Sequence, residues 1–187
     1  GYMLATPVQL AVATATLASR GEKIVPRLLR EVHLSGDDTV KTREPSRTMV
    51  ELRRDSHWDI MFNAMKKVVH GKKGTARATG VGMKFKMAGK TGTAQVFGIA
   101  QDEEYDAETV AKRLRDHGLF IAFGPMKNPM LAVAVVAENG EHGSSMAPVA
   151  RDLIQRYIEK YAPDVATVTN SETDDGVAFV VHADHVH

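Results

Sequence analysis

Two apolar runs that follow one another closely constrain the fold of this chain more than any other feature. They lie in the stretch LFIAFGPMKNPMLAVAVVAENG, at residues 119–123 and 130–137. Each run has the length of a β-strand, and the segment between them carries proline and asparagine, which favour turns. The pattern predicts an antiparallel β-hairpin.

A helix is predicted near the start of the chain, in ATPVQLAVATATLASRG. Thr6 is the expected N-cap, Pro7 takes the first helical position, and Gln9 stands three residues after the cap, which makes a capping box. Gly21 should end the helix. Because small alanines recur along it, the helix can pack closely against a neighbour, and we expect it in the core.

Two more helices are predicted from their caps and apolar stripes. One has Ser56 as N-cap and Asp59 at its third position, and it ends at Gly71. The other follows Ser144 or Ser145 as N-cap and should lie across the sheet. Their expected buried residues are Met61, Met65, Val68 and Val69 in the first, and Val149, Leu153, Ile154, Tyr157 and Ile158 in the second.

The segments between these elements are expected to be short or irregular. Residues 23–34 alternate loosely and indicate short extended structure, whereas residues 35–47 are rich in turn formers and should be exposed. Residues 71–82, GKKGTARATGVG, form a basic, glycine-rich loop. A short exposed helix is predicted between Asp106 as its cap and Gly118 as its end.

Together these elements predict an α+β fold, with about three antiparallel core strands and helices packed on them. The chain has 187 residues, of which 43% are hydrophobic, enough for one ordinary domain. We assign residues 1–162 to this domain. Residues 163–187 lose periodicity and collect Thr, Asp, Asn and Ser, so we expect a poorly ordered tail there.

Charge and composition exclude several kinds of protein. Lys and Arg number 24 against 23 acidic residues, and the formal net charge of +1 argues against a nucleic-acid surface. The chain has no cysteine, which excludes disulfides, thiolate zinc sites and cysteine nucleophiles. Its longest apolar run, residues 131–137, is too short to span a bilayer. Because the chain opens at Gly1 without Met, we expect that it was cut from a longer protein.

The stretch KMAGKTGTAQV carries four consecutive residues of chemical interest within a predicted strand, namely Lys90, Thr91, Gly92 and Thr93. A Lys-Thr-Gly strand is one of three signatures of the penicillin-recognising serine enzymes, and the others are Ser-x-x-Lys and Ser-x-Asn. Three residues alone are a weak match. The segments around them decide whether the match has meaning.

Six stretches of the chain occur in the order typical of one family: GYMLATPVQLAVATATLASRG, GTAR, AGKTGTAQV, DHGLFIAFGP, AVAVVAENG and GSSMAPVARD. Residues 1–162 thereby resemble the C-terminal part of the transpeptidase domain of class B penicillin-binding proteins. The long segment between the Lys-Thr-Gly strand and DHGLF resembles the elongation type, penicillin-binding protein 2 of Gram-negative bacteria. The tail resembles no part of this family.

The resemblance implies a DD-transpeptidase that cross-links peptidoglycan stem peptides through an acyl-serine intermediate. Lys90 and Thr93 would be its catalytic residues in this chain, and both would also bind substrate together with Thr91 and Gly92. The Lys90 ammonium would face the terminal carboxylate of D-Ala-D-Ala, the threonine hydroxyls would orient it, and the Thr93 N–H would be one oxyanion donor. Gly92 would allow close approach, because a Cβ there would meet the ligand backbone.

The resemblance also implies the setting of this activity. The full fold would have a five-stranded sheet, with two strands from earlier sequence, and an extended substrate would lie along the Lys-Thr-Gly strand. β-Lactams would bind at the same site, with no cofactor and no metal. The protein would work on the periplasmic side of the inner membrane, anchored by an upstream segment, with membrane proteins of the elongation complex as partners.

The chain departs from the family at the nucleophile. None of its seven serines is followed by Lys three residues later, and Ser35-Gly36-Asp37 follows the first helix, in a turn-rich loop, so we interpret it as an ordinary loop. Both missing motifs precede GYMLATP in the family. We therefore expect the nucleophile on upstream sequence and this chain to be inactive alone.

Two other function classes remain open. A β-lactam sensor or β-lactamase shares the Lys-Thr-Gly strand, although DHGLFIAFGP disfavours that assignment. A non-catalytic binding or dimerisation module is the third class. If the two earlier strands are missing, the strand at residues 130–137 presents an unpaired edge and apolar surface, which predicts a homodimer.

Several residues have simpler structural explanations. Lys90 alone would be read as a solvated lysine at a strand edge, and only the flanking matches reverse that preference. The cations of the basic loop, Lys72, Lys73 and Arg77, are expected to be solvated rather than ligand-binding. His117 is assigned a structural role at a helix end. The spacing of His182, His185 and His187 fits no standard helical pair of metal ligands.

Overall fold

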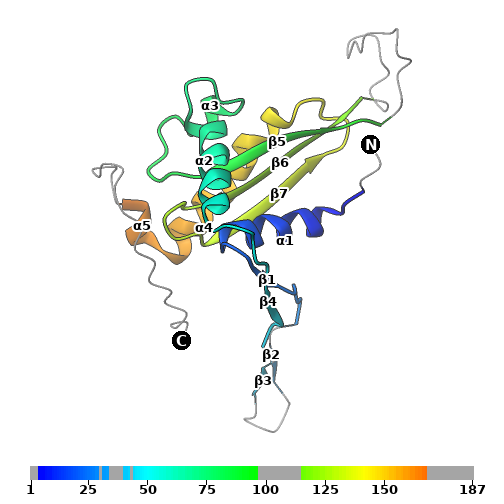
Figure 1. The fold of residues 1–187 in the computed structure, drawn as a ribbon, viewed down its shortest axis with the longest axis vertical. Coiled ribbons are helices and arrows are strands. Elements are labelled where there is room, and N and C mark those ends of the chain that lie inside the picture. Colours follow the sequence, from blue (N-terminus) through cyan, green and yellow to red (C-terminus); the bar gives the residue numbers. More distant parts are fainter. Residues whose placement is uncertain (1–3, 30, 34–39, 43, 97–114, 168–187) are drawn as a thin grey trace.

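The computed structural model describes residues 4–29, 31–33, 40–42, 44–96 and 115–167 (Figure 1). It contains both helices and antiparallel sheets, as the sequence predicts. In chain order the elements are α1 (Pro7–Ala18), β1 (Glu22–Ile24), β2 (Glu31–His33), β3 (Val40–Thr42), β4 (Arg47–Met49), α2 (Ser56–His70), α3 (Arg77–Gly80), β5 (Ala88–Ala94), β6 (His117–Gly124), β7 (Leu131–Ala137), the 3-10 helix η2 (Gly143–Met146), α4 (Ala147–Tyr161) and α5 (Pro163–Thr167).

The main sheet has three antiparallel strands in the order β5-β6-β7. The predicted hairpin is its second half, since β6 pairs with β7 from Gly118 opposite Ala137 to Gly124 opposite Leu131. Strand β5 pairs with the other side of β6. The α+β architecture and the three core strands are therefore confirmed.

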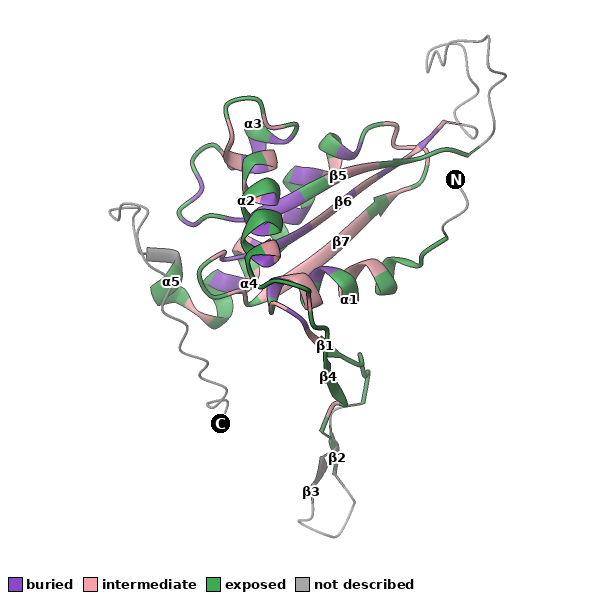
Figure 2. Ribbon diagram, in the orientation of Figure 1, coloured by how far each residue is buried: buried purple, intermediate pink, exposed green. Residues whose placement is uncertain are grey.

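The central strand β6 is apolar toward both faces of the sheet, and each face has its own layer of helix. Phe120 and Ala122 pack in a cluster with Ile154 and Ile158 of α4. Phe123 packs on the opposite side, in a cluster with Ala18 of α1 and with Phe62 and Met65 of α2. We call these two sides the α4 face and the α1 face. Figure 2 shows β6 as largely buried between them.

Helix α1 begins as predicted. The Gln9 backbone N–H donates to Thr6 Oγ1 over 3.2 Å, and the Thr6 N–H donates to Gln9 Oε1 over 2.8 Å, so the capping box is complete. The helix ends at Ala18, and the Gly21 N–H bonds back to the carbonyl of Thr16 over 2.8 Å. Thr14 and Ala18 are buried, and α1 packs on β6 and β7, but Ala13 and Ala15 are exposed. The helix therefore covers the sheet with one face, and its predicted position inside the core is wrong.

Helix α2 ends at Gly71 as predicted, but its start and its buried face differ. Ser56 is the first helical residue rather than the cap, and Asp55 at the N-cap makes no side-chain cap bond. Met61 is 42% exposed, so its predicted burial is wrong. The stripe instead begins at the aromatic residues Trp58 and Phe62, which bury more apolar area than Met61 would.

Helix α4 lies on the sheet as predicted, and Ile154 and Ile158 are buried as expected, but the rest of its buried stripe differs and it has no serine cap. Ser144 and Ser145 belong to η2, and the N-cap of α4 is Met146, with no side-chain cap bond. Val149 and Leu153 are exposed. The buried residues are Ala147, Ala150, Ile154 and Ile158, because the two alanines let the helix backbone approach the sheet closely.

The segment between α1 and α2 forms two small antiparallel ribbons. Strand β1 pairs with β4, and β2 pairs with β3. Figure 1 shows both ribbons extending away from the main sheet. Residues 35–47, which the sequence predicts to be turn-rich and exposed, also contain β3 and the start of β4, since strands with available partners override local turn preference.

The C-terminal segment and the segment before β6 differ in part from the sequence predictions. Helix α5 lies inside residues 163–187, for which the sequence predicts a poorly ordered tail, and residues 168–187 are outside the described part. The helix predicted from Asp106 falls on residues 97–114, which are also outside it. Gly118 does not end that helix, because it is the second residue of β6. None of the helices that the structure describes is long and apolar enough to cross a bilayer.

Strand β7 has a single strand neighbour, β6, among the described residues. Helices α1 and α4 contact it, and its side chains are mostly half-buried. The expected homodimer through this edge stays a prediction.

The packing of α4 predicts opposite outcomes for two neighbouring residues. Ile154→Ala removes a fully buried side chain and should lower the free energy of unfolding of the chain by about 2–5 kcal/mol. Leu153→Ala changes a side chain that is 48% exposed and should stay within about 0.5 kcal/mol of the original. Urea denaturation followed by circular dichroism measures both. Equal losses in the two variants would contradict the observed face of α4.

Candidate active-site strand

The predicted Lys-Thr-Gly-Thr strand is β5, and it lies at the edge of the main sheet. In the described part of the chain its only strand neighbour is β6, so one side of β5 carries no partner strand. Lys90 and Thr93 are exposed, and Thr91 and Gly92 are half-buried. An unpaired strand edge of this kind can accept an extended peptide through backbone hydrogen bonds.

The register of β5 assigns its side chains to the two faces of the sheet. Residues opposite each other in an antiparallel pair point to the same face. Lys90 is opposite Ile121, which packs on the α1 face, whereas Thr91 is opposite Phe120, which packs on the α4 face. The alternation places Thr93 on the same face as Thr91. Lys90 and the two threonines are therefore on opposite faces of the sheet.

The Lys90 ammonium bends back onto its own strand. Its Nζ donates to the backbone carbonyl oxygen of Thr91 over 2.6 Å, and no described acidic residue forms an ion pair with it. A neutral carbonyl is a weaker partner for an ammonium than a carboxylate is. The cation is thus held beside β5, where an incoming anion can replace the carbonyl as its partner.

The Thr91 hydroxyl has a neighbour that the sequence analysis did not identify. Thr75 Oγ1 lies 3.4 Å from Thr91 Oγ1, and either hydroxyl can be the donor. Thr75 comes from the loop between α2 and α3, within GTAR. That stretch was part of the family pattern, but only the fold brings its threonine to β5.

Gly92 lies against a second glycine, Gly143, which the sequence analysis also missed. A Cβ on Gly143 would collide with the carbonyl oxygens of Gly92 and Leu119 and would lie 2.7 Å from the Gly92 nitrogen. A Cβ on Gly92 would instead meet only Leu119, with the side chain at 3.3 Å and the carbonyl oxygen at 3.9 Å. Of these two positions, Gly143 is therefore the one at which the packing of the chain itself requires a glycine. Contact of Gly92 with a ligand backbone stays a prediction.

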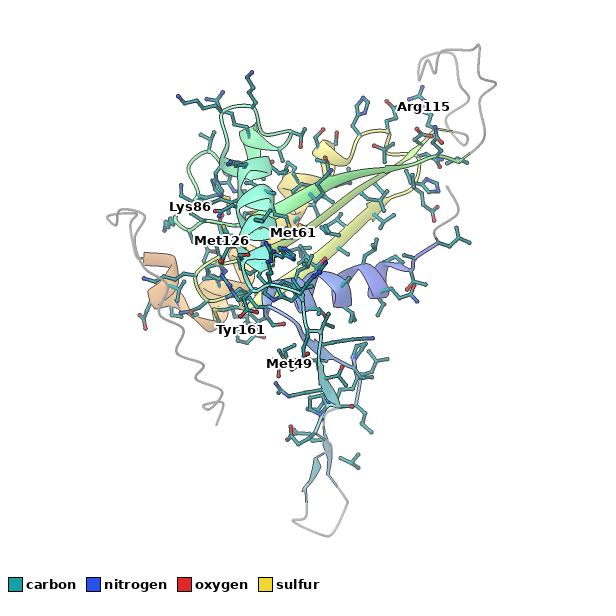
Figure 3. The ribbon with its side chains drawn as sticks, in the orientation of Figure 1. Met49, Met61, Lys86, Arg115, Met126 and Tyr161 are labelled. Carbon is teal, nitrogen blue, oxygen red and sulfur yellow. The ribbon has the colours of Figure 1, made fainter. Side chains whose placement is uncertain are left out.

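The loop that carries Gly143 is fixed to the start of β6. The Asn139 N–H donates to His117 Nδ1 over 2.9 Å, and the Asn139 side-chain amide donates to the Arg115 carbonyl over 2.9 Å. Glu141 forms an ion pair with Arg115, and its N–H bonds to the Asp116 carbonyl over 2.9 Å. Figure 3 places Arg115 at the end of the sheet far from Lys86. The network keeps η2 against β5.

His117 has the structural role that the sequence predicts, but at a different place. It is the first residue of β6, opposite Ala94, rather than the end of a helix. Its Nδ1 accepts the backbone hydrogen bond from Asn139, so it orders the loop after β7.

His70 connects α2 to the segment that enters β5. The buried Met87 donates its backbone N–H to His70 Nε2 over 3.2 Å, which requires a neutral imidazole. Burial lowers the pKa of His70 to about 4, and the positive charges of Lys86 and Lys66 add to the effect. This histidine therefore acts as a fixed acceptor at neutral pH.

The described residues offer no metal site, since no three His, Cys, Asp or Glu side chains among them converge. The three C-terminal histidines of the sequence lie outside this part of the chain. A shallow hollow on α4 is lined by Asp152, Gln155, Arg156 and Glu159, which all belong to that helix, and it does not include β5. The candidate site is the open strand β5 with its neighbours Thr75 and Gly143.

Comparison with known families gives one match across most of the chain. Residues 1–155 match the family described as penicillin binding protein transpeptidase domain. The chain is 36% identical over 177 residues to the peptidoglycan D,D-transpeptidase MrdA of Acinetobacter baumannii. That alignment covers 95% of the chain and 26% of the relative, so the chain spans about a quarter of the length of this enzyme.

Solved structures give the same result for the fold. The PBP2 of Pseudomonas aeruginosa, solved in complex with WCK 5153, superposes with a TM-score of 0.64 and 34% identity over 91% of this chain and 33% of that one. The PBP2 of Helicobacter pylori, solved in complex with MreC, gives a TM-score of 0.64 with 24% identity, over 86% of this chain and 26% of that one. At that identity the second comparison supports the fold alone.

The contact between Gly143 and β5 predicts that one added methyl group destabilises the fold. Gly143→Ala should lower the free energy of unfolding by about 1–3 kcal/mol, because the backbone of Gly92 or Leu119 has to move. Ser144→Ala is the matched control, since Ser144 is exposed and should change stability by less than about 0.5 kcal/mol. Thermal unfolding measures both. A Gly143→Ala variant as stable as the control would rule out the close approach.

The His70 contact predicts a dependence of stability on pH. The pKa of His70 is near 6.5 in the unfolded chain and about 4 in the folded one, so its stabilising contribution is complete above pH 6.5 and is lost as the pH falls toward 4. Because the side chain is half-buried, we expect a loss on the order of 1 kcal/mol between pH 7 and pH 5.

Variants at two histidines isolate this effect from that of the other titrating groups. His70→Gln removes the titration, so its stability should change less between pH 7 and pH 5 than that of the original chain. His142→Gln replaces an exposed histidine and should leave the original pH dependence in place. The urea concentration at the midpoint of unfolding is measured for each protein at the two pH values. If this midpoint falls as much from pH 7 to pH 5 in His70→Gln as in the original chain, the assignment to His70 is refuted.

Proposed function

The chain belongs to the penicillin-binding protein transpeptidase domain family, and we propose from this that it supplies the carboxylate-binding strand of a peptidoglycan D,D-transpeptidase. The observation that carries the proposal is the open edge of β5, where Lys90, Thr91 and Thr93 follow one another with no partner strand in the described part of the chain. A stem peptide ending in D-Ala-D-Ala is the substrate class that this strand fits.

Each residue of the strand has a defined task in this proposal, and Thr93 has two. The Lys90 ammonium exchanges the Thr91 carbonyl for the terminal carboxylate of the peptide. The hydroxyls of Thr91 and Thr93 donate to the same carboxylate. The Thr93 N–H is one of the two donors that stabilise the oxyanion. Gly92 lets the peptide backbone lie flat on the strand.

The nucleophile is a serine outside residues 1–187, in a Ser-x-x-Lys motif on earlier sequence. None of the serines in this chain has Lys three residues later. The serine oxygen would bond to the carbonyl carbon of the penultimate D-alanine, and the terminal D-alanine would leave as a protonated amine. An amine of a second stem peptide would then take the acyl group and release the serine. Residues 1–187 alone would therefore be inactive.

The same premise suggests the setting of the enzyme. Like the relatives named MrdA, the parent protein would build cell wall, on the periplasmic side of the inner membrane, with an upstream anchor. β-Lactams would acylate it as substrate mimics. Membrane proteins of the elongation complex would be its partners, and the Helicobacter pylori PBP2 solved with MreC is an example of such a pair.

Intact mass spectrometry with a reactive β-lactam tests the proposal. Acylation adds the whole drug to one serine, so we expect no adduct on residues 1–187 and a stoichiometric adduct on the longer protein that includes the upstream sequence. An adduct on residues 1–187 would identify one of its own serines as the nucleophile. No adduct on either protein would indicate a binding module without transpeptidase chemistry.

The role of Lys90 can be measured in the longer protein. Lys90→Gln should slow acylation by a carboxylate-bearing β-lactam by roughly 10- to 100-fold, the range expected when a hydrogen bond to a charged group is lost. Lys67→Gln is the matched control, since Lys67 is an exposed lysine on α2. Equal acylation rates in the two variants would contradict the proposed role of Lys90 in carboxylate binding.

A further inference from the structure

We propose that Thr75 is a substrate-binding residue whose hydroxyl shares the ligand carboxylate with that of Thr91. This inference rests on the proposed function and adds the loop between α2 and α3 to its site. The two hydroxyl oxygens are 3.4 Å apart. That distance is long for an O–H···O hydrogen bond, which is typically about 2.7–2.8 Å. The pair is therefore only weakly satisfied by itself.

Two hydroxyls at this separation suit a shared anionic acceptor. A carboxylate oxygen placed at normal hydrogen-bond distance from both can accept one proton from each, because each hydroxyl rotates to direct its proton. Hydrogen bonds to an ionised acceptor are shorter and stronger than those between neutral groups. Binding of the carboxylate would thus replace one long neutral contact by two charge-assisted bonds.

The backbone around Thr75 is held on the α2 side. The following residue, Ala76, is buried, and its N–H donates to the Val68 carbonyl over 3.0 Å. The preceding residue, Gly74, packs so closely on α2 that a Cβ there would collide with the Val68 carbonyl oxygen, and its N–H bonds to the Gly71 carbonyl over 3.0 Å. Thr75 is fixed between two anchored neighbours while its own side chain is exposed.

Helix α3, which follows this loop directly, is held on the α4 side. Arg151 of α4 donates from Nη1 to the Thr79 carbonyl over 3.0 Å and to the Val81 carbonyl over 3.2 Å. Helix α3 is thereby tied to α4, on the face of the sheet that carries Thr91. A hydroxyl held in advance from both sides binds an anion without the cost of ordering a loop.

The charge around Thr75 also favours an anion. Between Asp59 and Asp102 the sequence has eight Lys and Arg residues and no acidic residue. Lys72 and Lys73 lie in the loop itself and Arg77 is the first residue of α3. All three are exposed and form no ion pair with any described residue. Their charges make the potential around Thr75 more positive, which favours an anion there.

The experiment uses the longer protein with its upstream sequence and two forms of one ligand, benzylpenicillin and its methyl ester. Thr75→Val removes the hydroxyl at nearly constant volume and should slow acylation by benzylpenicillin roughly tenfold or more. The same variant should acylate with the ester at the rate of the original protein, because the ester lacks the charged acceptor. Thr75→Ser keeps the hydroxyl and should restore the rate with benzylpenicillin.

Two further variants separate binding from folding. Thr48→Val changes an exposed threonine of β4, outside the site, and should leave both rates unchanged. Thr75→Val combined with Thr91→Val should cost less than the sum of the single effects, since the two hydroxyls share one acceptor. Unchanged acylation by benzylpenicillin in Thr75→Val, or an equal loss with the ester, would overturn the inference. If the original protein is not acylated at all, the proposed function fails first.

Discussion

The register of β5 against β6 is the constraint on which the candidate site depends. Strand β6 sends Phe120 to the α4 face and Phe123 to the α1 face, and both side chains are fully buried. A slip of one residue would exchange every side chain of β5 between the two faces. Because both faces of β6 are covered by helices, the burial of its core side chains fixes the register. The register in turn determines which face carries Lys90 and which carries Thr91.

The sequence predicted the parts of the fold whose signals are local. The hairpin, the capping box of α1 and the glycine end of α2 each depend on residues close in the chain, and each is confirmed. The faces of α2 and α4 were predicted less well. Both helices carry more apolar residues than one stripe can bury, so the contact with the sheet decides, and it selects Phe62 over Met61 and Ala150 over Val149.

The candidate site divides in the same way. Lys90 to Thr93 are consecutive, so a short pattern is enough to find them. Thr75 and Gly143 reach β5 only through the packing of the loop after α2 and of η2 on the sheet. Their stretches were noticed in the sequence, but a threonine before a short helix and a glycine before a serine pair have many ordinary roles. Only the three-dimensional arrangement distinguishes them.

Position also changes the interpretation of the basic loop. From the sequence, exposed Lys72, Lys73 and Arg77 are most simply solvated side chains. Along the chain they flank Thr75, whose hydroxyl lies close to Thr91 of β5. Solvated cations still shape the potential of a nearby site, even when none of them contacts the ligand. The loop can therefore favour a carboxylate in two ways. At short range the Thr75 hydroxyl donates a hydrogen bond, which requires an ordered backbone. At longer range the charges of the loop attract the anion, which does not.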